Sequence, residues 1–272
     1  MPELPEVETI ARALRGQVVG QAVRAAQVRW PRAVATPAPD EFVAALVGRR
    51  ITAVGRRAKF LVLTLAPQGY LLIHLRMTGR LLYEAAGADP RPLDGHTHVS
   101  LYFQGGGALH YHDQRKFGRL YLVGDPDEVL RGLGLEPLEA SPEQFAALLR
   151  ARRRQIKPLL LDQHVLAGLG NIYTDESLWR AGVHPLRRAD TLAAADVSRL
   201  YEAIRAVLTE AIANKGTTLR DYRAPNGETG ENQWSLAVYG RAGEPCPRCG
   251  QAVQRVVVGS RGTHLCPQCQ SL

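Results

Sequence analysis

The four cysteines of the chain lie in its last 27 residues, as two C-x2-C pairs separated by sixteen residues: Cys246, Cys249, Cys266 and Cys269. Four thiolates presented by two tight turns can surround one Zn²⁺ ion tetrahedrally, and this spacing is typical of a zinc ribbon. No open coordination position is apparent, so the predicted metal is structural. Residues 246–272, the cysteine module, are too few to hold a core without it. Two disulfides are the alternative, which a reducing cytosol disfavours.

The size and charge of the chain narrow its class. With 272 residues, 45% of them hydrophobic, it can form two domains, or one large domain with an appended module. Its formal net charge of +8 favours a polyanionic partner such as nucleic acid. The chain has no apolar run of about 18 residues and does not start like a secretory signal. We therefore expect a soluble, cytoplasmic protein.

The first half of the chain has the pattern of a β protein that follows a short helix. Apolar residues at helical spacing predict a helix over 6–16. From about 20 to 125, β-branched, aromatic and leucine-rich runs alternate with Gly or Pro. The clearest predicted strands are 60–65, 70–75, 99–103, 109–112 and 120–123. Many short strands with turn signals predict an antiparallel sandwich or barrel.

The pattern becomes helical at residue 141. The sequence SPEQ over 141–144 is a capping box with proline at the first helical position. Apolar periodicity then predicts helices over 156–165, 172–181 and 197–211, and Gly216 gives a stop signal after the last of them. The polar residues 217–235 are predicted to form a loop that leads to the cysteine module.

The start of the chain carries a candidate nucleophile. Removal of Met1 would leave the secondary amine of Pro2 close to Glu3 and Glu6. An α-amine titrates near ~7.7–8.0, against ~10.4 for lysine, so more of it is neutral at cellular pH. Condensation of a secondary amine with a carbonyl gives an iminium, which favours elimination nearby. The alternative is that Pro5 and Glu6 merely open a helix.

Six motifs agree in order and spacing. They are PELPE (2–6), RAKF (57–60), HLRMTG (74–79), DQRKFG (113–118), GLGNIY (168–173) and the cysteine module. Together they closely resemble bacterial formamidopyrimidine-DNA glycosylases, also called 8-oxoguanine DNA glycosylases, from residue 2 to about 270. The resemblance implies an α+β fold in three domains. These are an antiparallel β-sandwich with an N-terminal helix (1–131), a helix-two-turn-helix domain (132–220), and a lesion-capping loop with a zinc finger (221–272).

The same resemblance implies a bifunctional DNA glycosylase and abasic-site (AP) lyase of base excision repair. The enzyme would flip out oxidised purines, namely 8-oxoguanine and formamidopyrimidines, and excise them through a Schiff base with Pro2. It would then nick the strand by β,δ-elimination. The implied partner is double-stranded DNA that contains oxidised purines or abasic sites, and the implied protein is a nucleoid-associated monomer.

Four residues form the implied catalytic set. Pro2 displaces the base, and Glu3 exchanges protons with the sugar and the leaving base as a general acid/base. Glu6 orients a water or the sugar ring, with a first-turn dipole partner as the alternative. Lys59 holds a phosphate beside the lesion and assists the second elimination. The alternative for Lys59 is a solvated basic turn after Arg56 and Arg57.

Further residues are expected to contact DNA. Met77, Arg115 and Phe117 match the family's set that fills the space left by the extruded nucleotide, where Arg115 faces the orphaned cytosine. From the residues alone, Met77 and Phe117 fit an ordinary core. Backbone contacts are expected from Asn171 and Arg261.

Two further DNA contacts are expected. Lys157 is also expected to reach a phosphate, with a solvated face beside 152–154 as the alternative, and a plain glycine turn is the alternative for Asn171. His96 is assigned to DNA binding, and the histidines show no metal-ligand pattern.

The lesion-capping loop is expected to include Thr217, Thr218, Leu219, Arg220, Asp221 and Tyr222. Residues 225–234 depart from the family's usual run in their second half. Two other functions compete. One is an endonuclease VIII-like glycosylase for oxidised pyrimidines, against which Leu4 counts because that group typically has glycine there. The other is a non-catalytic zinc-ribbon protein that binds damaged DNA.

Overall fold

The computed structural model describes residues 1–89, 92–219, 222–225 and 227–272, which form two compact units. Unit 1 consists of Met1–Arg131 and Asn214–Glu231, and unit 2 of Gly132–Ala213 and Asn232–Leu272. The segment 214–231 thus belongs to unit 1, although it follows the helices of unit 2 in the sequence. The division into three domains stays a prediction.

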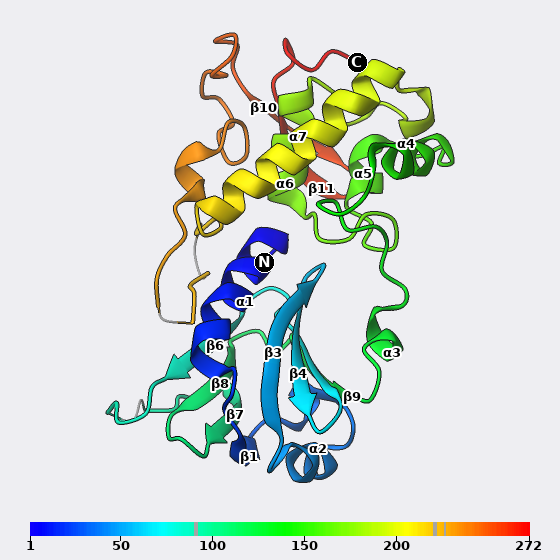
Figure 1. Cartoon of the computed structure of the whole chain (residues 1–272). Coiled ribbons are helices and arrows are strands. Elements are labelled where there is room, and N and C mark those ends of the chain that lie inside the picture. The colour runs from blue at the N-terminus through cyan, green and yellow to red at the C-terminus, as the bar shows by residue number, and fades with distance from the viewer. Residues whose placement is uncertain (90–91, 220–221, 226) are drawn as a thin grey trace. The chain divides into compact units, whose positions relative to one another are not determined.

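Unit 1 is a β-sandwich that begins with helix α1 (Leu4–Val18) (Figure 1). One sheet has the order β1-β7-β8-β6, with bounds Val23–Val28, Thr97–Phe103, Ala108–Asp113 and Gly79–Glu84. The other has the order β2-β9-β5-β4-β3, with bounds Val34–Thr36, Arg119–Val123, Tyr70–His74, Phe60–Ala66 and Arg50–Arg57. Neighbouring strands are antiparallel except for β2 and β9, which are parallel. The five strands predicted from the sequence are confirmed, with ends within two residues.

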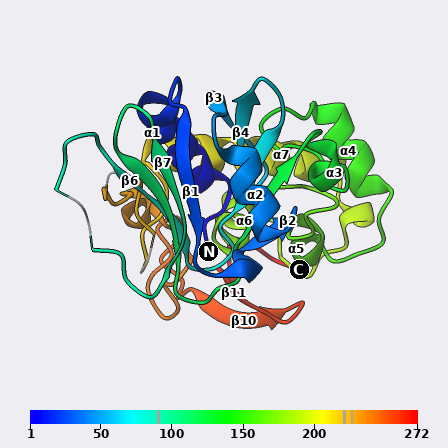
Figure 2. The same ribbon diagram turned by 90° about the horizontal axis from the view of Figure 1, so that it is seen from below.

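One apolar core joins both sheets to the helices of unit 1. Leu61, Leu63 and Leu65 alternate along β4 and are buried, as expected for a strand with one face in a core. Helix α1 contributes a stripe at helical spacing, with Val7 and Leu14 among its buried residues. Helix α2 (Pro39–Leu46) packs beside β1 and β2 and adds Phe42 and Leu46 to the same core (Figure 2). A short helix, α3 (Asp127–Leu130), ends the first segment of unit 1.

The strand register brings several loops to one end of the sandwich. Phe60 pairs with His74, and His74 pairs with Arg119. Gly79 pairs with Asp113 in the other sheet. The β3–β4 turn and the loops 75–78 and 114–118 therefore lie at the same end. These segments carry the RAKF, HLRMTG and DQRKFG motifs.

Unit 2 is helical with a C-terminal hairpin. Its α-helices and strands are α4 (Pro142–Arg150), α5 (Ile156–Leu160), α6 (Asn171–Ala181), α7 (Ala194–Ala213), β10 (Gln254–Val258) and β11 (Arg261–Leu265). The predicted capping box is confirmed, because Ser141 Oγ accepts the Gln144 N–H at 3.2 Å and Gln144 Oε1 accepts the Ser141 N–H at 2.9 Å. Helix α5 ends five residues before the predicted 165. There, Asp162 accepts the His164 N–H and pairs with Arg154, and such local bonds compete with a helix.

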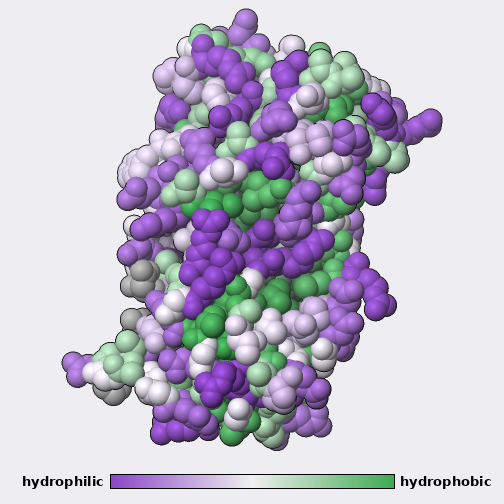
Figure 3. Space-filling view, viewed as in Figure 1, coloured by the Kyte–Doolittle hydropathy of each residue, from purple (hydrophilic) through white to green (hydrophobic). Residues whose placement is uncertain are grey.

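Polar side chains cover much of the face seen in Figure 3, with apolar patches between them. Across the described ranges, no helix has both the length and the apolar character needed to cross a membrane.

Candidate nucleic-acid interface and metal centre

The predicted nucleophile lies at the start of α1. The helix begins at Leu4, so Pro2 lies just before its positive end. Pro2 is buried, whereas Met1 is 47% exposed. Glu3 is also buried, and its N–H donates to Glu6 Oε2 at 2.8 Å. One side chain of the PELPE motif thus fixes the backbone beside the proline.

Glu6 also holds the segment that follows α7. Its Oε1 accepts the Thr217 N–H at 2.7 Å, and the Glu6 side chain is buried. A Cβ atom on Gly216 would lie 2.9 Å from Glu6 Oε1, and the φ of Gly216 is +82°, so glycine is required on both counts. Glu6 is therefore more than a partner of the helix dipole, because its two oxygens bind two separated parts of unit 1.

The expected capping segment folds back on itself. Thr218 Oγ1 accepts the Gly230 N–H at 2.9 Å and donates to the Tyr222 carbonyl at 3.2 Å. Leu219 is 52% exposed. Arg220 and Asp221 lie outside the described residues.

Tyr222 joins this segment to α1. Its hydroxyl donates to the Lys215 carbonyl at 3.2 Å and lies 3.5 Å from the Glu6 carbonyl. Burial, and then the charge of Glu6, raise the pKa of Tyr222, so the hydroxyl remains a donor.

Lys59 lies in the β3–β4 turn and is 5% exposed, so the alternative of a solvated turn is wrong. The adjacent β3 residue Arg56 pairs with Glu8 of α1 at 3.3 Å, which aligns the first turns of the helix with this end of the strand. Burial, and then the charges of Arg76 and Lys59, lower the pKa of His74 to about 3. The histidine beside the turn is therefore neutral, and the lysine contributes the positive charge.

Met77, Arg115 and Phe117 lie in the two loops at the same end of the sandwich. Met77 is 40% and Phe117 50% exposed, so the alternative of an ordinary core is wrong for both. The Arg115 guanidinium lies 4.7 Å from the centre of the Phe117 ring. Exposed apolar side chains beside a stacked arginine can enter a base stack. Sequence reasoning missed Asp113, the buried residue that opens the DQRKFG motif and binds both loops.

His96 is exposed near the same loops. Its N–H donates to Asp94 Oδ1 at 3.0 Å, and its carbonyl accepts the Asp113 N–H at 2.9 Å. The backbone of His96 is thus fixed while its ring is accessible.

In unit 2, Lys157 is not where we expected it. Its side chain is fully buried, and Nζ donates to Asp175 Oδ1 at 2.6 Å and to the Gly262 carbonyl at 3.2 Å. A lysine enclosed in this way cannot reach a phosphate, nor does it form a solvated face, so both predictions for it are wrong. Burial of the pair depends on tertiary packing between α5, α6 and the hairpin, which local sequence does not reveal.

Asn171 and Arg261 are brought together. Asn171 is the first residue of α6, and its Nδ2 donates to the Gly262 carbonyl at 2.8 Å. Arg261 precedes Gly262 at the start of β11 and is exposed. Glu176, one helical turn further along α6, accepts the N–H groups of residues 237–239 at 2.8–3.0 Å.

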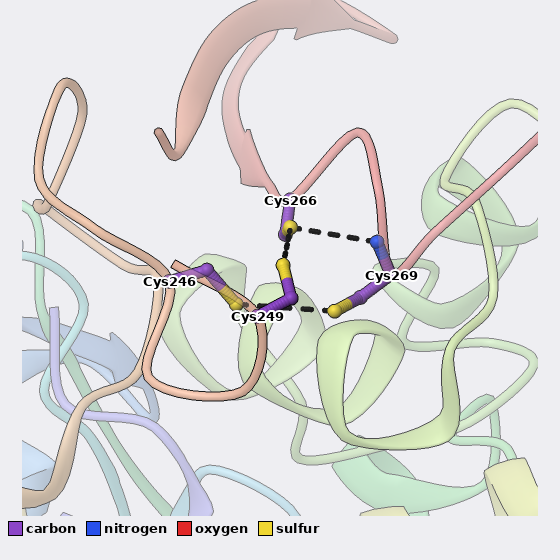
Figure 4. Close-up of side chains that lie close together, drawn as sticks. All are labelled: Cys246, Cys249, Cys266 and Cys269. Atoms are coloured by element: carbon purple, nitrogen blue, oxygen red, sulfur yellow. Dashed lines mark hydrogen bonds between the residues drawn. The ribbon is translucent and has the colours of Figure 1, made fainter. Parts of the chain in front are cut away.

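The four cysteine sulfurs lie within 4.8 Å of one another (Figure 4). Cys246 and Cys269 Sγ are 3.9 Å apart and Cys249 and Cys266 Sγ 3.5 Å, and all four thiols are free. A tetrahedral site with Zn–S bonds of ~2.3 Å has S···S edges of about 3.8 Å. The arrangement therefore fits one structural Zn²⁺ ion and not the two disulfides considered as an alternative.

The electrostatics of the thiols also fit a cation. Burial raises the pKa of Cys246, but hydrogen bonds from the Arg248 N–H and the Trp179 indole outweigh it and lower the pKa to about 6. Burial, and then the neighbouring sulfurs, raise the pKa of Cys269 to about 12. One thiolate forms readily, and its negative charge disfavours further thiolates nearby. A divalent cation would offset this repulsion between the sulfurs.

Three family models match consecutive parts of the chain. They are the formamidopyrimidine-DNA glycosylase N-terminal domain over residues 1–120, the formamidopyrimidine-DNA glycosylase H2TH domain over 133–223, and the zinc finger found in FPG and IleRS over 243–272. The formamidopyrimidine-DNA glycosylase of Roseiflexus is 49% identical over 99% of this chain and 100% of its own length. That of Chloroflexus aurantiacus is 48% identical over 99% of this chain and 98% of its own length.

Solved structures of similar proteins agree over the same span. A Lactococcus lactis enzyme variant in complex with DNA containing Fapy-dG has a TM-score of 0.91 and 38% identity, with full coverage of both chains. A complex of the Lactococcus lactis protein with abasic-site DNA has the same TM-score and identity over 99% of this chain and 100% of that one.

Proposed function

The chain belongs to the formamidopyrimidine-DNA glycosylase family, and we propose that it excises oxidised purines from duplex DNA and then cuts the strand as an AP lyase. The observation that carries the proposal is the chain start. Pro2 lies at the positive end of α1, beside two buried carboxylates, and becomes a free secondary amine once the exposed Met1 is removed.

The chemistry follows from that amine. Its nitrogen attacks C1′ of the sugar, the bond from C1′ to the base breaks, and the base leaves with the electron pair and a proton. Glu3 adjoins the amine and is positioned to give a proton to the ring oxygen as the sugar opens. The amine loses its own proton, and the product is an iminium between Pro2 and C1′.

The iminium drives both strand cuts. Because it withdraws electrons, the proton on C2′ is lost and the bond from C3′ to its phosphate oxygen breaks. Loss of a proton from C4′ then expels the 5′ phosphate. Lys59, a buried lysine beside the neutral His74, is placed by this proposal at the phosphate. Water finally hydrolyses the imine and frees Pro2.

The remaining residues help to extrude the damaged nucleotide and bind the DNA backbone. A base in duplex DNA is reached only after its nucleotide leaves the stack, which costs a few kcal/mol. The exposed Met77, Arg115 and Phe117 fill that space in our proposal, and Arg115 offers donors to the orphaned cytosine. Asn171 and Arg261 grip the backbone, since such contacts position DNA without reading its sequence. The protein acts at the nucleoid, where its substrate is.

Glycosylase assays on matched duplexes test the proposal. We expect excision of 8-oxoguanine opposite cytosine to exceed excision of thymine glycol. We also expect borohydride to reduce the iminium and so to trap a covalent complex between the protein and the DNA strand that carried the lesion. A preference for thymine glycol would instead indicate the endonuclease VIII-like activity. Tight binding of damaged duplex with neither strand cutting nor a trapped adduct would indicate a non-catalytic damage-binding protein.

A further inference from the structure

Asp113, the last residue of β8, is fully buried and carries a carboxylate that organises the loops around it. Its two oxygens accept four hydrogen bonds, all from neutral donors. The donors are Thr78 Oγ1 at 2.5 Å, the Tyr111 hydroxyl at 2.9 Å, the Arg115 N–H at 3.1 Å and the Gly118 N–H at 2.8 Å.

These bonds connect the segments that carry the predicted DNA contacts. Thr78 directly follows Met77, and its Oγ1 also accepts the Arg115 N–H at 3.1 Å. The backbone of Asp113 adds two further links. Its N–H donates to the His96 carbonyl, and its carbonyl lies 2.8 Å from His98 Nε2. A single residue thus ties together the loops that present Met77, Arg115, Phe117 and His96.

The loops need such support because their backbones are unusual. Arg76 has φ +54° and Lys116 has φ +59°, the left-handed region that costs a non-glycine residue about 1–2 kcal/mol. The two N–H groups that Asp113 binds, those of residues 115 and 118, flank Lys116 on both sides. Loop 114–118 is therefore held in a conformation that its own residues do not favour.

The site is built to keep the carboxylate charged. Burial by itself raises the pKa of Asp113, but hydrogen bonds from Thr78, Gly118 and Tyr111 outweigh it and leave the pKa below its ordinary value. A Cβ atom at Gly118 would lie 1.9 Å from the Tyr111 hydroxyl oxygen, so glycine is required for tyrosine to reach the carboxylate. Gly118, the last residue of the DQRKFG motif, thus leaves the space that Tyr111 needs to bind Asp113, the first residue of the motif.

We propose that Asp113 is a positioning residue for damaged-base excision. By holding Thr78, the Arg115 N–H and the Gly118 N–H together, it preorganises Met77, Arg115 and Phe117 to enter the base stack as the nucleotide leaves it. The inference rests on the proposed function, because it assigns these side chains to the space that extrusion opens.

The test uses Asp113→Asn in the full-length zinc-loaded enzyme. The amide keeps one acceptor oxygen and puts an N–H₂ in place of the other, opposite either the Arg115 N–H or the Gly118 N–H, so one of these two N–H groups loses its acceptor. Because a misplacement of about 1 Å can cost 10²-fold in rate, we expect roughly a 10–100-fold slower excision of 8-oxoguanine opposite cytosine. The preference for cytosine over adenine opposite the lesion should fall with it. Borohydride trapping on a single-stranded abasic oligonucleotide, which needs no stack to be filled, should stay within about twofold of wild type.

Controls separate positioning from stability and from the proposed function. Leu46→Ala weakens the same core from α2, away from Asp113, and should leave the cytosine preference unchanged in the folded enzyme. Thr78→Val and Tyr111→Phe each remove one donor and keep the carboxylate, and should lower duplex excision and the cytosine preference to a smaller extent. If Asp113→Asn does not fold, these two variants test the positioning role in its place.

The outcomes are distinct. Duplex excision and cytosine preference within twofold of wild type in folded Asp113→Asn, or in the Thr78→Val and Tyr111→Phe pair, would overturn the positioning role. An equal loss on the single-stranded abasic substrate would overturn it too. Failure of the wild-type enzyme to trap any abasic DNA would instead refute the proposed function.

Discussion

In the sandwich, apolar side chains from both sheets, α1 and α2 form one large core. By contrast, the core cluster described around the cysteine module consists of Val238, Val253 and two of the cysteines, Cys246 and Cys266. The two regions also treat buried charge differently. Asp113 in unit 1 is held by neutral donors, whereas Asp175 in unit 2 pairs with the equally buried Lys157. The sandwich therefore depends on burial of apolar area, and the module depends on a metal and an ion pair.

Removal of the metal is expected to have the largest effect on stability, and to affect the cysteine module but not the sandwich. Structural zinc contributes about 10–16 kcal/mol of apparent binding free energy in small zinc-binding peptides. A strong chelator at neutral pH should therefore abolish amide protection over residues 254–265 and leave strands β4 and β5 protected. Hydrogen exchange followed by mass spectrometry measures both. Unchanged protection of the hairpin in metal-free protein would show that its small core suffices.

Loss of the buried ion pair should be the next largest effect. Lys157→Met leaves Asp175 charged and without its cation, and breaking a buried pair in this way costs about 3–5 kcal/mol. We expect that loss in the denaturant unfolding of unit 2, followed by the fluorescence of Trp179. The double variant Lys157→Met with Asp175→Leu should recover much of it. A single variant as stable as wild type would mean that the pair is not what anchors Gly262.

The sandwich is expected to respond to pH through His74. Its pKa is about 3 in the folded protein against 6.5 for the free side chain, so below pH 6.5 the unfolded chain binds a proton that the folded chain does not. Stability should then fall as pH falls, by about 1.4 kcal/mol per pH unit between pH 6 and 4. His74→Gln should reduce this slope in urea titrations that monitor unit 1. An identical slope in the variant would place the titrating group elsewhere.

The helix cap in unit 2 should have the smallest effect. Ser141→Ala removes the acceptor for the Gln144 N–H, and loss of an N-cap costs about 1 kcal/mol. Thermal unfolding should show a small decrease in Tm with no change in zinc content. Ser141→Asp, which keeps an acceptor, should stay close to wild type, and a larger loss in it than in alanine would contradict the capping role.

The elements were predictable from the sequence where local pattern decides them. In strand β4, buried apolar residues alternate with less buried ones, and proline follows the strand directly. The SPEQ capping box predicts the start of α4. Helix α5 was overestimated because Asp162 binds locally. The burial of Lys157 depends on contacts with residues 18 and 105 positions away, which no local pattern contains.

The candidate site was likewise predictable only where its residues are close in sequence. The cysteine spacing was sufficient for the metal, since the ligands are chemically distinctive and close in sequence. Met77 and Phe117 fit a core by composition, and only the resemblance placed them at the DNA. Asp113 lay within a recognised motif, but its role depends on donors from its own strand β8 and from two loops that meet only in the fold.

The central claim is that the amine of Pro2 becomes bonded to the deoxyribose. Borohydride reduction with 8-oxoguanine duplex, proteolysis and mass analysis test it directly, with Pro2→Gly as the comparison for excision. We predict that the sugar adduct maps to the peptide that begins at Pro2, and that Pro2→Gly loses most base excision. An adduct on another residue such as Lys59, or full excision by chains that retain Met1, would contradict the claim.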